Sequence, residues 1–221
     1  MKLAYKNFST VIETSSKNVA TIVVENSEMM YRFLMDLRRA VEKTASEIVI
    51  SDDNRIIDFN KNVELLINFI QFELNQRTLL SKIMASMEEI SESSSYYNDS
   101  QQILSQIEKH IMEITIDFPC DIICEKLNMQ SIIKAIGIAL SDDYSSLEEK
   151  LLAYMDLARD FLNKKLFILV NVRGLIPHNR LQMLVDSALS REHEILLIDN
   201  MAYPKLKQEN RLIIDEDLCE I

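Results

Sequence analysis

Residues 164–171 read Lys-Lys-Leu-Phe-Ile-Leu-Val-Asn, and residues 194–199 read Glu-Ile-Leu-Leu-Ile-Asp. Each stretch is a continuous apolar run between charged or polar ends, which is typical of a strand buried on both faces of a parallel sheet. The residues between the two runs have the spacing of one helix, so together they predict a right-handed βαβ unit. We therefore expect an α/β fold with a mainly parallel sheet.

The turn after the first run bears on nucleotide binding. Sheets of this kind bind nucleotides through a glycine-rich turn, where backbone amides approach the phosphates closely. Here Gly174 stands alone in the turn, the only other glycine of the chain is Gly137, and no Gly-Lys-Ser or Gly-Lys-Thr sequence occurs. The sequence therefore predicts a degenerate P-loop-like architecture that lacks the phosphate loop, with no bound nucleotide and no ATP hydrolysis.

Further segments extend the sheet toward the N-terminus. Residues 18–25 predict a first buried strand, and residues 47–51 a short strand with a hairpin turn at 52–55. Residues 63–70 predict another strand, although their pattern also allows a helix. Between these strands, Ser27 is expected to cap a helix, and the outer face of that helix gathers four cations: Arg32, Arg38, Arg39 and Lys43.

The pattern becomes helical from residue 75, with apolar residues recurring at threes and fours. A polar break at 91–98 indicates a hairpin tip between two long helices, and the second helix is expected to bury Ile103, Leu104, Ile107 and Ile111. We therefore expect an α/β head in two parts, residues 1–75 and 161–221. An acidic, long α-helical projection at residues 76–160 interrupts it.

Charge is distributed unevenly along the chain. The formal net charge is -11, and residues 88–160 hold 15 acidic and 5 basic side chains, against 20 and 19 in the remainder. Because phosphate attraction acts over a Debye length of roughly 8 to 10 Å, a protein that is acidic overall can still offer a locally basic surface. The excess of acid therefore does not exclude a nucleic-acid partner.

The N-terminus and the cysteines indicate the cellular setting. The chain lacks the apolar run of a signal peptide, and no apolar segment approaches the roughly 20 residues that cross a bilayer. The three cysteines, Cys120, Cys124 and Cys219, are odd in number, which favours reduced thiols over a disulfide framework. We expect a cytoplasmic protein without a membrane partner.

Two stretches carry a resemblance to a known family. Residues 137–171, which end in the apolar run quoted above, and the terminal Leu-Ile-Ile-Asp-Glu-Asp at 212–217 are similar to the spacer-acquisition protein of type II-A CRISPR systems. The resemblance implies a homotetrameric ring that encircles double-stranded DNA and binds its ends. It also implies, as partners, the CRISPR integrase complex and the effector nuclease of the same system, and calcium binding.

A DNA-binding surface would be built from cations that contact phosphates without reading bases. The candidates lie around the central strand and on the first helix: Lys164, Lys165, Arg173, Arg38, Arg39 and Lys43. The alternative is that they are ordinary solvated residues around a sheet, with weak surface ion pairs.

Three carboxylates at helical spacing, Asp117, Asp121 and Glu125, are the candidates for calcium, because calcium takes six to eight oxygen ligands. The stretch departs from the densely acidic pattern of the family, since apolar residues and Lys126 interrupt it. A solvated acidic face is the alternative.

The sequence offers few combinations of side chains that could carry out catalysis. The three histidines are dispersed and give no triad order, so we expect a protein that is not an enzyme. A metal-dependent nuclease that uses Asp199 and Asp215, which follow two expected strands, is the alternative. A helical scaffold without a nucleic-acid role is the third interpretation.

Overall fold

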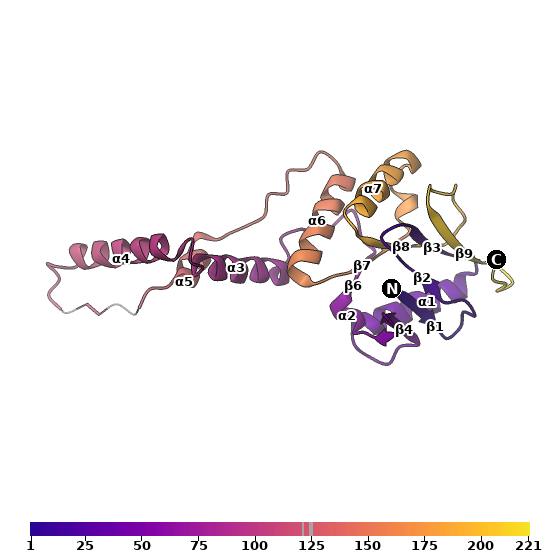
Figure 1. Ribbon diagram of the computed structural model, residues 1–221, viewed down its shortest axis with the longest axis horizontal. Coiled ribbons are helices and arrows are strands. Elements are labelled where there is room, and N and C mark those ends of the chain that lie inside the picture. Colours follow the sequence, from indigo (N-terminus) through magenta and orange to yellow (C-terminus); the bar gives the residue numbers. More distant parts are fainter. Residues whose placement is uncertain (121, 124–125) are drawn as a thin grey trace. The chain divides into compact units, whose positions relative to one another are not determined.

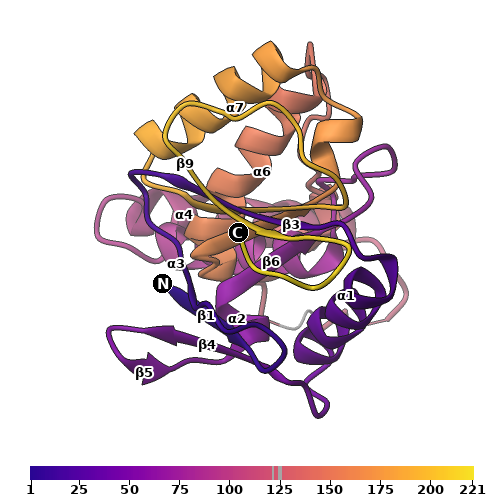
Figure 2. The same ribbon diagram turned by 90° about the vertical axis from the view of Figure 1, so that its right-hand side faces the viewer.

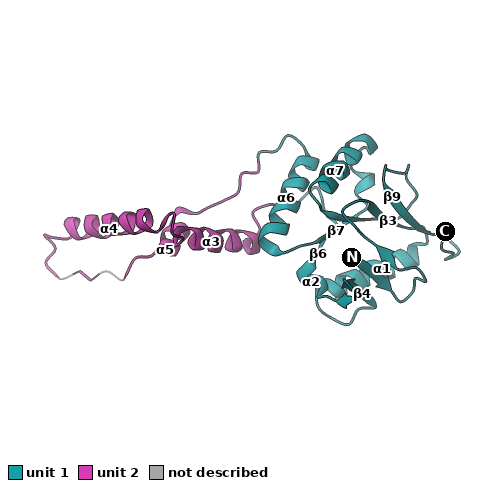
Figure 3. Cartoon of the chain, viewed as in Figure 1, with its two compact units in different colours: residues 1–72, 143–221 teal, residues 73–142 magenta. Residues whose placement is uncertain are grey.

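The structure is a computed structural model that describes residues 1–120, 122–123 and 126–221 (Figure 1). It divides into two compact units: unit 1 comprises residues 1–72 and 143–221, and unit 2 comprises residues 73–142 (Figure 3). The sequence placed the boundaries after residues 75 and 160 instead. The second boundary differs because helix α6 (Leu147–Leu162) buries Leu151, Tyr154, Met155 and Ala158 within unit 1.

Five strands of the described chain form the central sheet of unit 1. Their order is β6 (Val63–Leu66), β7 (Leu166–Val170), β8 (Glu194–Asp199), β3 (Val19–Val24) and β9 (Glu209–Ile214). All four pairings are parallel, with Ile168 opposite both Leu65 and Leu196. The predicted α/β fold with a mainly parallel sheet is confirmed. β6 is shorter than the predicted 63–70, because Asn68 forms a turn by accepting a hydrogen bond from the backbone of Gln71.

Helices cover both faces of this sheet (Figure 2). α6 and α7 (His178–Ser190) lie on one face, and the short helix η1 (Val172–Gly174) connects β7 to α7. α1 (Ser27–Val41) lies on the other face. β3 leads into α1 through Glu25 and Asn26 alone, so no glycine-rich phosphate loop stands between them.

A second, antiparallel sheet packs beside α1. Its order is β2 (Ile12–Glu13), β1 (Lys2–Tyr5), β4 (Ile48–Asp52) and β5 (Arg55–Ile56). The predicted hairpin is confirmed: Asp53 and Asn54 both have positive φ, as a two-residue turn of this kind requires. The rings of Tyr5, Phe8 and Phe33 meet at centroid distances of 4.9 to 5.1 Å and join this sheet to α1.

Unit 2 is helical, with α3 (Arg77–Ser91), α4 (Tyr97–Ile114) and α5 (Met129–Ile136). α5 packs against α3, where Gln130 donates a hydrogen bond of 2.8 Å to Glu88. α4 differs from expectation, because it buries Leu104 but leaves Ile103, Ile107 and Ile111 exposed. Among the described residues, no helix is both long and apolar enough to cross a membrane.

Candidate nucleic-acid interface

The outer face of α1 presents a row of paired cations. Arg32 Nε lies 2.9 Å from Glu28 Oε1, and Arg38 Nε lies 2.8 Å from Glu42 Oε1, each pair one helical turn apart. Both pairs are well exposed, and exposed pairs of this kind contribute only about 0 to 1 kcal/mol. A phosphate group could therefore displace the carboxylates at little cost.

Arg39 differs from its neighbours because its partner is buried. Its Nη1 lies 2.8 Å from Oδ1 of Asp36, and 54% of the Arg39 side chain is exposed against 6% of Asp36. The hydroxyl of Tyr5 donates to the second Asp36 oxygen at 3.1 Å, and burial raises the pKa of that hydroxyl. Arg39 is thus an exposed guanidinium that a buried carboxylate holds in one orientation.

A second group of predicted cations meets around the short helix α2 (Phe59–Asn62). Lys43 Nζ lies 3.1 Å from Asp58, the residue that caps α2. Lys164 donates to the carbonyls of Asn60 and Val63 at 2.6 and 2.8 Å, and its side chain is only 14% exposed. The structure therefore brings Lys43 and Lys164 to opposite ends of α2, with Lys164 binding orphan carbonyls at its C-terminal end.

Lys165 is the more accessible of the two lysines before β7. Its backbone N–H donates to the carbonyl of Asn62, and its Nζ lies 2.9 Å from Oδ2 of Asp52. This hydrogen bond raises the pKa of Lys165 and lowers the pKa of Asp52. The Lys165 side chain is exposed and Asp52 is only half-buried, so Lys165 can reach a ligand without loss of a fully buried contact.

Arg173 lies in a different environment from the other candidates. Its side chain is 3% exposed and lies between two buried carboxylates, with Nε 3.1 Å from Asp199 and Nη2 2.9 Å from Glu209. It also donates to the hydroxyl of Thr21 and the carbonyl of Pro204, both at 3.2 Å. A side chain enclosed in this way has no surface to offer to a phosphate outside the protein, so we leave Arg173 out of the DNA-facing set.

Asp199 is the member of this buried cluster whose carboxylate lacks hydrogen bonds in the described chain. Arg173 approaches it without the alignment of a hydrogen bond, so both Asp199 oxygens are buried without a donor in the described chain. Burial, with a smaller contribution from Glu209, raises the pKa of Asp199 to about 6. The nuclease alternative needs carboxylates that are open to a metal ion, and Asp199 is fully buried. Asp215 is also engaged, since it accepts hydrogen bonds from the backbones of Asp217 and Cys219.

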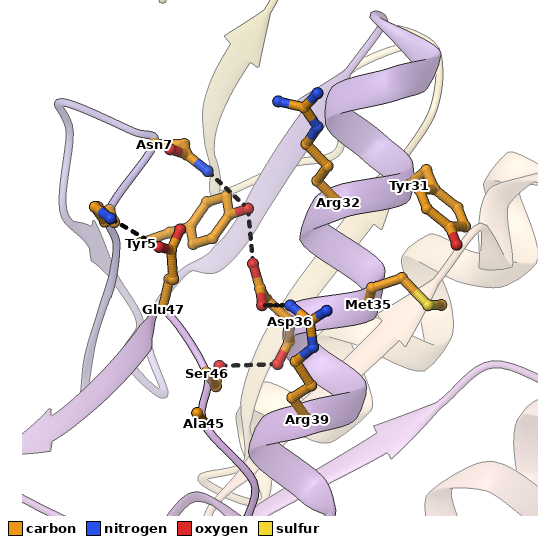
Figure 4. A pocket seen from close by; sticks show the side chains of 11 residues that line it. Tyr5, Asn7, Tyr31, Arg32, Met35, Asp36, Arg39, Ala45, Ser46 and Glu47 are labelled. Atoms are coloured by element: carbon orange, nitrogen blue, oxygen red, sulfur yellow. Dashed lines mark hydrogen bonds and ion pairs between the residues drawn. The ribbon is translucent and has the colours of Figure 1, made fainter.

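A pocket of about 650 Å³ opens beside the α1 cations (Figure 4). It lies between α1, the residues after β1 and the residues before β4. Lys6, Tyr31, Arg32 and Arg39 contribute to its lining. The sequence analysis missed Lys6 and Tyr31. Tyr31 could have been found, because the apolar spacing of the helix leaves position 31 outside the buried face.

The predicted metal ligands are only partly described. Asp117 is exposed after the end of α4, whereas Asp121 and Glu125 lie outside the described residues, as does Cys124. In the described ranges, no three or more His, Cys, Asp or Glu side chains come together in a way that could hold a metal ion. Calcium binding stays a prediction.

Comparison with known families gives the deciding observation. A family model described as "CRISPR-associated protein (Cas_Csn2)" matches residues 41–218. The chain belongs to the Cas_Csn2 family. The match includes the cations around α2 but begins at Val41, the last residue of α1, so the Arg side chains on α1 lie outside it.

One solved structure shares the fold of this Cas_Csn2 chain. Stu0660 of Streptococcus thermophilus is similar with a TM-score of 0.59 and 17% identity, over 100% of this chain and 76% of that chain. A putative ABC transporter ATP-binding protein from Pyrococcus furiosus has a TM-score of 0.40 and 10% identity, over 96% and 94%, a likeness too low to carry an argument. No curated protein matches the sequence. The family assignment confirms the resemblance inferred from the sequence.

Proposed function

We propose that this Cas_Csn2 protein acts in CRISPR spacer acquisition, where it binds the ends of double-stranded DNA without sequence preference as a homotetrameric ring. Membership of a CRISPR-associated family is the observation that carries this proposal. In this role the chain binds DNA and does not cut it, and its protein partners are the integrase complex and the effector nuclease.

The distribution of cations supports a phosphate-binding surface. Arg38, Lys43 and Lys165 are exposed, and each is held only by a weak surface ion pair. Contacts of this kind position DNA by its backbone and give no base specificity. Because bound cations release counterions from the duplex, affinity should fall steeply with salt.

The exposed apolar face of α4 supports self-association. Isoleucines at one-turn intervals along α4 remain open to solvent in the single chain: Ile103, Ile107, Ile111 and Ile114. A contiguous apolar face of this kind is typical of a surface that is covered in an assembly. Identical copies related by closed symmetry would cover it in every protomer.

The decisive experiment compares linear duplex with a covalently closed circle of the same sequence, alongside native mass spectrometry. A closed ring must thread an end, so linear DNA should bind well and the circle poorly. Equal binding to both would overturn the ring and favour an open groove. A monomer at micromolar concentration would contradict the tetramer.

Charge reversal tests the DNA-facing surface. We expect Lys43→Glu with Lys165→Glu to weaken binding to all sequences alike and to lower the salt slope by about 1 for each lost contact. Lys82→Glu with Lys109→Glu is the matched control, because it changes the charge equally on exposed residues of unit 2. Lys164 and Arg39 are avoided, since both hold folded contacts. Equal affinities for the test and control variants would show that the surface is assigned wrongly.

Other experimental results would favour the two alternative functions, a nuclease or a helical scaffold. Cleavage of linear DNA in magnesium or manganese that disappears in Asp215→Ala would favour the nuclease. A tetramer that binds no DNA in any form would favour the helical scaffold. Calcium at Asp117, Asp121 and Glu125 predicts measurable heat on calcium titration that is lost in Asp117→Asn.

A further inference from the structure

The pocket beside α1 combines cations with an exposed aromatic ring. Its volume of about 650 Å³ lies within the range of small-ligand pockets, which is roughly 300 to 1,000 Å³. Tyr31 lines this pocket and its side chain is 61% exposed. Its neighbour on the helix, Arg32, also lines the pocket.

One cation of the pocket is fixed in advance. Asp36 holds Arg39 through one oxygen while Tyr5 donates to the other, and Ser46 donates to the backbone carbonyl of Asp36 at 2.9 Å (Figure 4). The bond to Asp36 uses one of the five N–H donors of the Arg39 guanidinium. A phosphate that binds the remaining donors therefore meets a preorganised partner, which lowers the entropic cost of binding.

The other two cations can move to a ligand. Lys6 pairs with Glu47 at 2.8 Å, and Arg32 pairs with Glu28 at 2.9 Å, with all four side chains exposed. Such pairs are weak, so these cations can leave their carboxylates for a phosphate at little cost. The pocket lining thus includes one fixed cation and two adjustable ones.

An aromatic ring beside phosphate-binding cations is the combination by which proteins bind single-stranded nucleic acid. Inside a duplex each base face is covered by its neighbours, so an interior nucleotide cannot stack on Tyr31. An unpaired nucleotide at an end can. We infer that this pocket binds an unpaired nucleotide at the end of a DNA duplex, with the base on Tyr31 and the phosphate on Arg32 and Arg39. The inference rests on the proposed DNA-end function, since it names what that function recognises at the end.

The test uses the full chain and three probes: a blunt duplex, the same duplex with a two-thymidine overhang at either end, and the 5′-phosphorylated oligonucleotide p(dT)4. We expect an overhang to bind more tightly than the blunt end by about 5- to 150-fold, the effect of one base stacked on an aromatic ring. Tyr31→Ala should remove this preference and Tyr31→Phe should keep it. Tyr97→Ala is the matched control, because Tyr97 is an exposed tyrosine of unit 2.

The outcomes separate this inference from the proposed function. Tight binding of the blunt duplex without overhang preference would overturn the inference and leave duplex-end binding intact. A preference that survives Tyr31→Ala would also overturn it, because the nucleotide would then bind elsewhere. Binding of p(dT)4 that depends on Tyr31, without binding of any duplex, would support the pocket and overturn the duplex function. Failure of every probe would overturn both.

Discussion

Arg173, Asp199 and Glu209 come from three different segments and meet where almost no solvent reaches them. Two carboxylates with one shared cation form an arrangement that is stable only as a set, because each charge has lost its hydration. Arg211 adds a second cation, with its Nε 2.7 Å from Glu209. At the scale of single residues, this cluster is where a substitution should have the largest effect.

We expect Arg173→Met to lower the free energy of unfolding by about 3 to 5 kcal/mol, because it leaves a buried carboxylate without its cation. Urea denaturation followed by circular dichroism measures this. Arg38→Met is the control, since its pair with Glu42 is exposed and its loss should cost no more than about 1 kcal/mol. Equal stabilities for the two variants would contradict the role of the cluster.

Asp199 also predicts a dependence of stability on pH. Burial raises its pKa in the folded protein to about 6, from an ordinary value of 3.8. Between these values the folded state holds a proton that the unfolded state has released, so stability falls as the pH rises from 4 to 6. The contribution is on the order of 3 kcal/mol, is favourable at the acid end and is lost above pH 6.

Asp199→Asn isolates this effect, because asparagine stays neutral in both states. We expect the stability of the variant relative to the wild type to rise by about 3 kcal/mol between pH 4 and 7. Urea denaturation across that range measures the difference, in which the titrations of groups that do not interact with Asp199 cancel. A difference that does not change with pH would contradict the raised pKa.

At the scale of elements, α1 depends on the residue that precedes it. Ser27 was expected to cap this helix, but the cap is Asn26, whose Oδ1 accepts a hydrogen bond of 3.0 Å from the backbone of Met29. Its Nδ2 donates at 3.0 Å to the carbonyl of Glu216. Asn26 therefore links the start of α1 to the C-terminal segment by a hydrogen bond. It lies between β3 and α1, at the position where nucleotide-binding proteins place a phosphate loop.

We expect Asn26→Ala to lower the free energy of unfolding by about 1 to 2 kcal/mol, since it removes a helix cap and a second hydrogen bond together. Gln76→Ala is a matched control, because Gln76 precedes α3 without a side-chain hydrogen bond to that helix. Its effect should stay within about 0.5 kcal/mol. Thermal unfolding of both variants measures the contrast, and an Asn26→Ala variant as stable as Gln76→Ala would show that the cap is unimportant.

At the scale of the whole molecule, the exposed isoleucines of α4 predict association. Ile107→Glu with Ile111→Glu should weaken self-association by more than about tenfold, because charge would enter a surface that copies cover. Gln102→Glu with Gln106→Glu adds the same charge at exposed polar positions of α4 and should leave it unchanged. Analytical ultracentrifugation reports the assembly. If both variants assemble identically, α4 is not part of the interface between copies.

The α/β class could be predicted from local sequence alone, because a buried strand is encoded by a short apolar pattern. The apolar runs at 166–170 and 194–199 and the hairpin at Asp53 and Asn54 all lie where this pattern predicts them. The lack of a phosphate loop is equally local, since a chain with two glycines cannot build one.

The roles of the charged and exposed side chains, by contrast, depend on how the chain folds. Arg173 and Lys165 look alike in the sequence, as cations beside one strand, yet Arg173 is enclosed by residues 199 and 209 and Lys165 meets Asp52 in solvent. The isoleucines of α4 follow a core pattern but find no partner helix to cover them among the described residues. Burial and ion pairing depend on residues far apart in the chain, whereas helix and strand patterns repeat within a few residues.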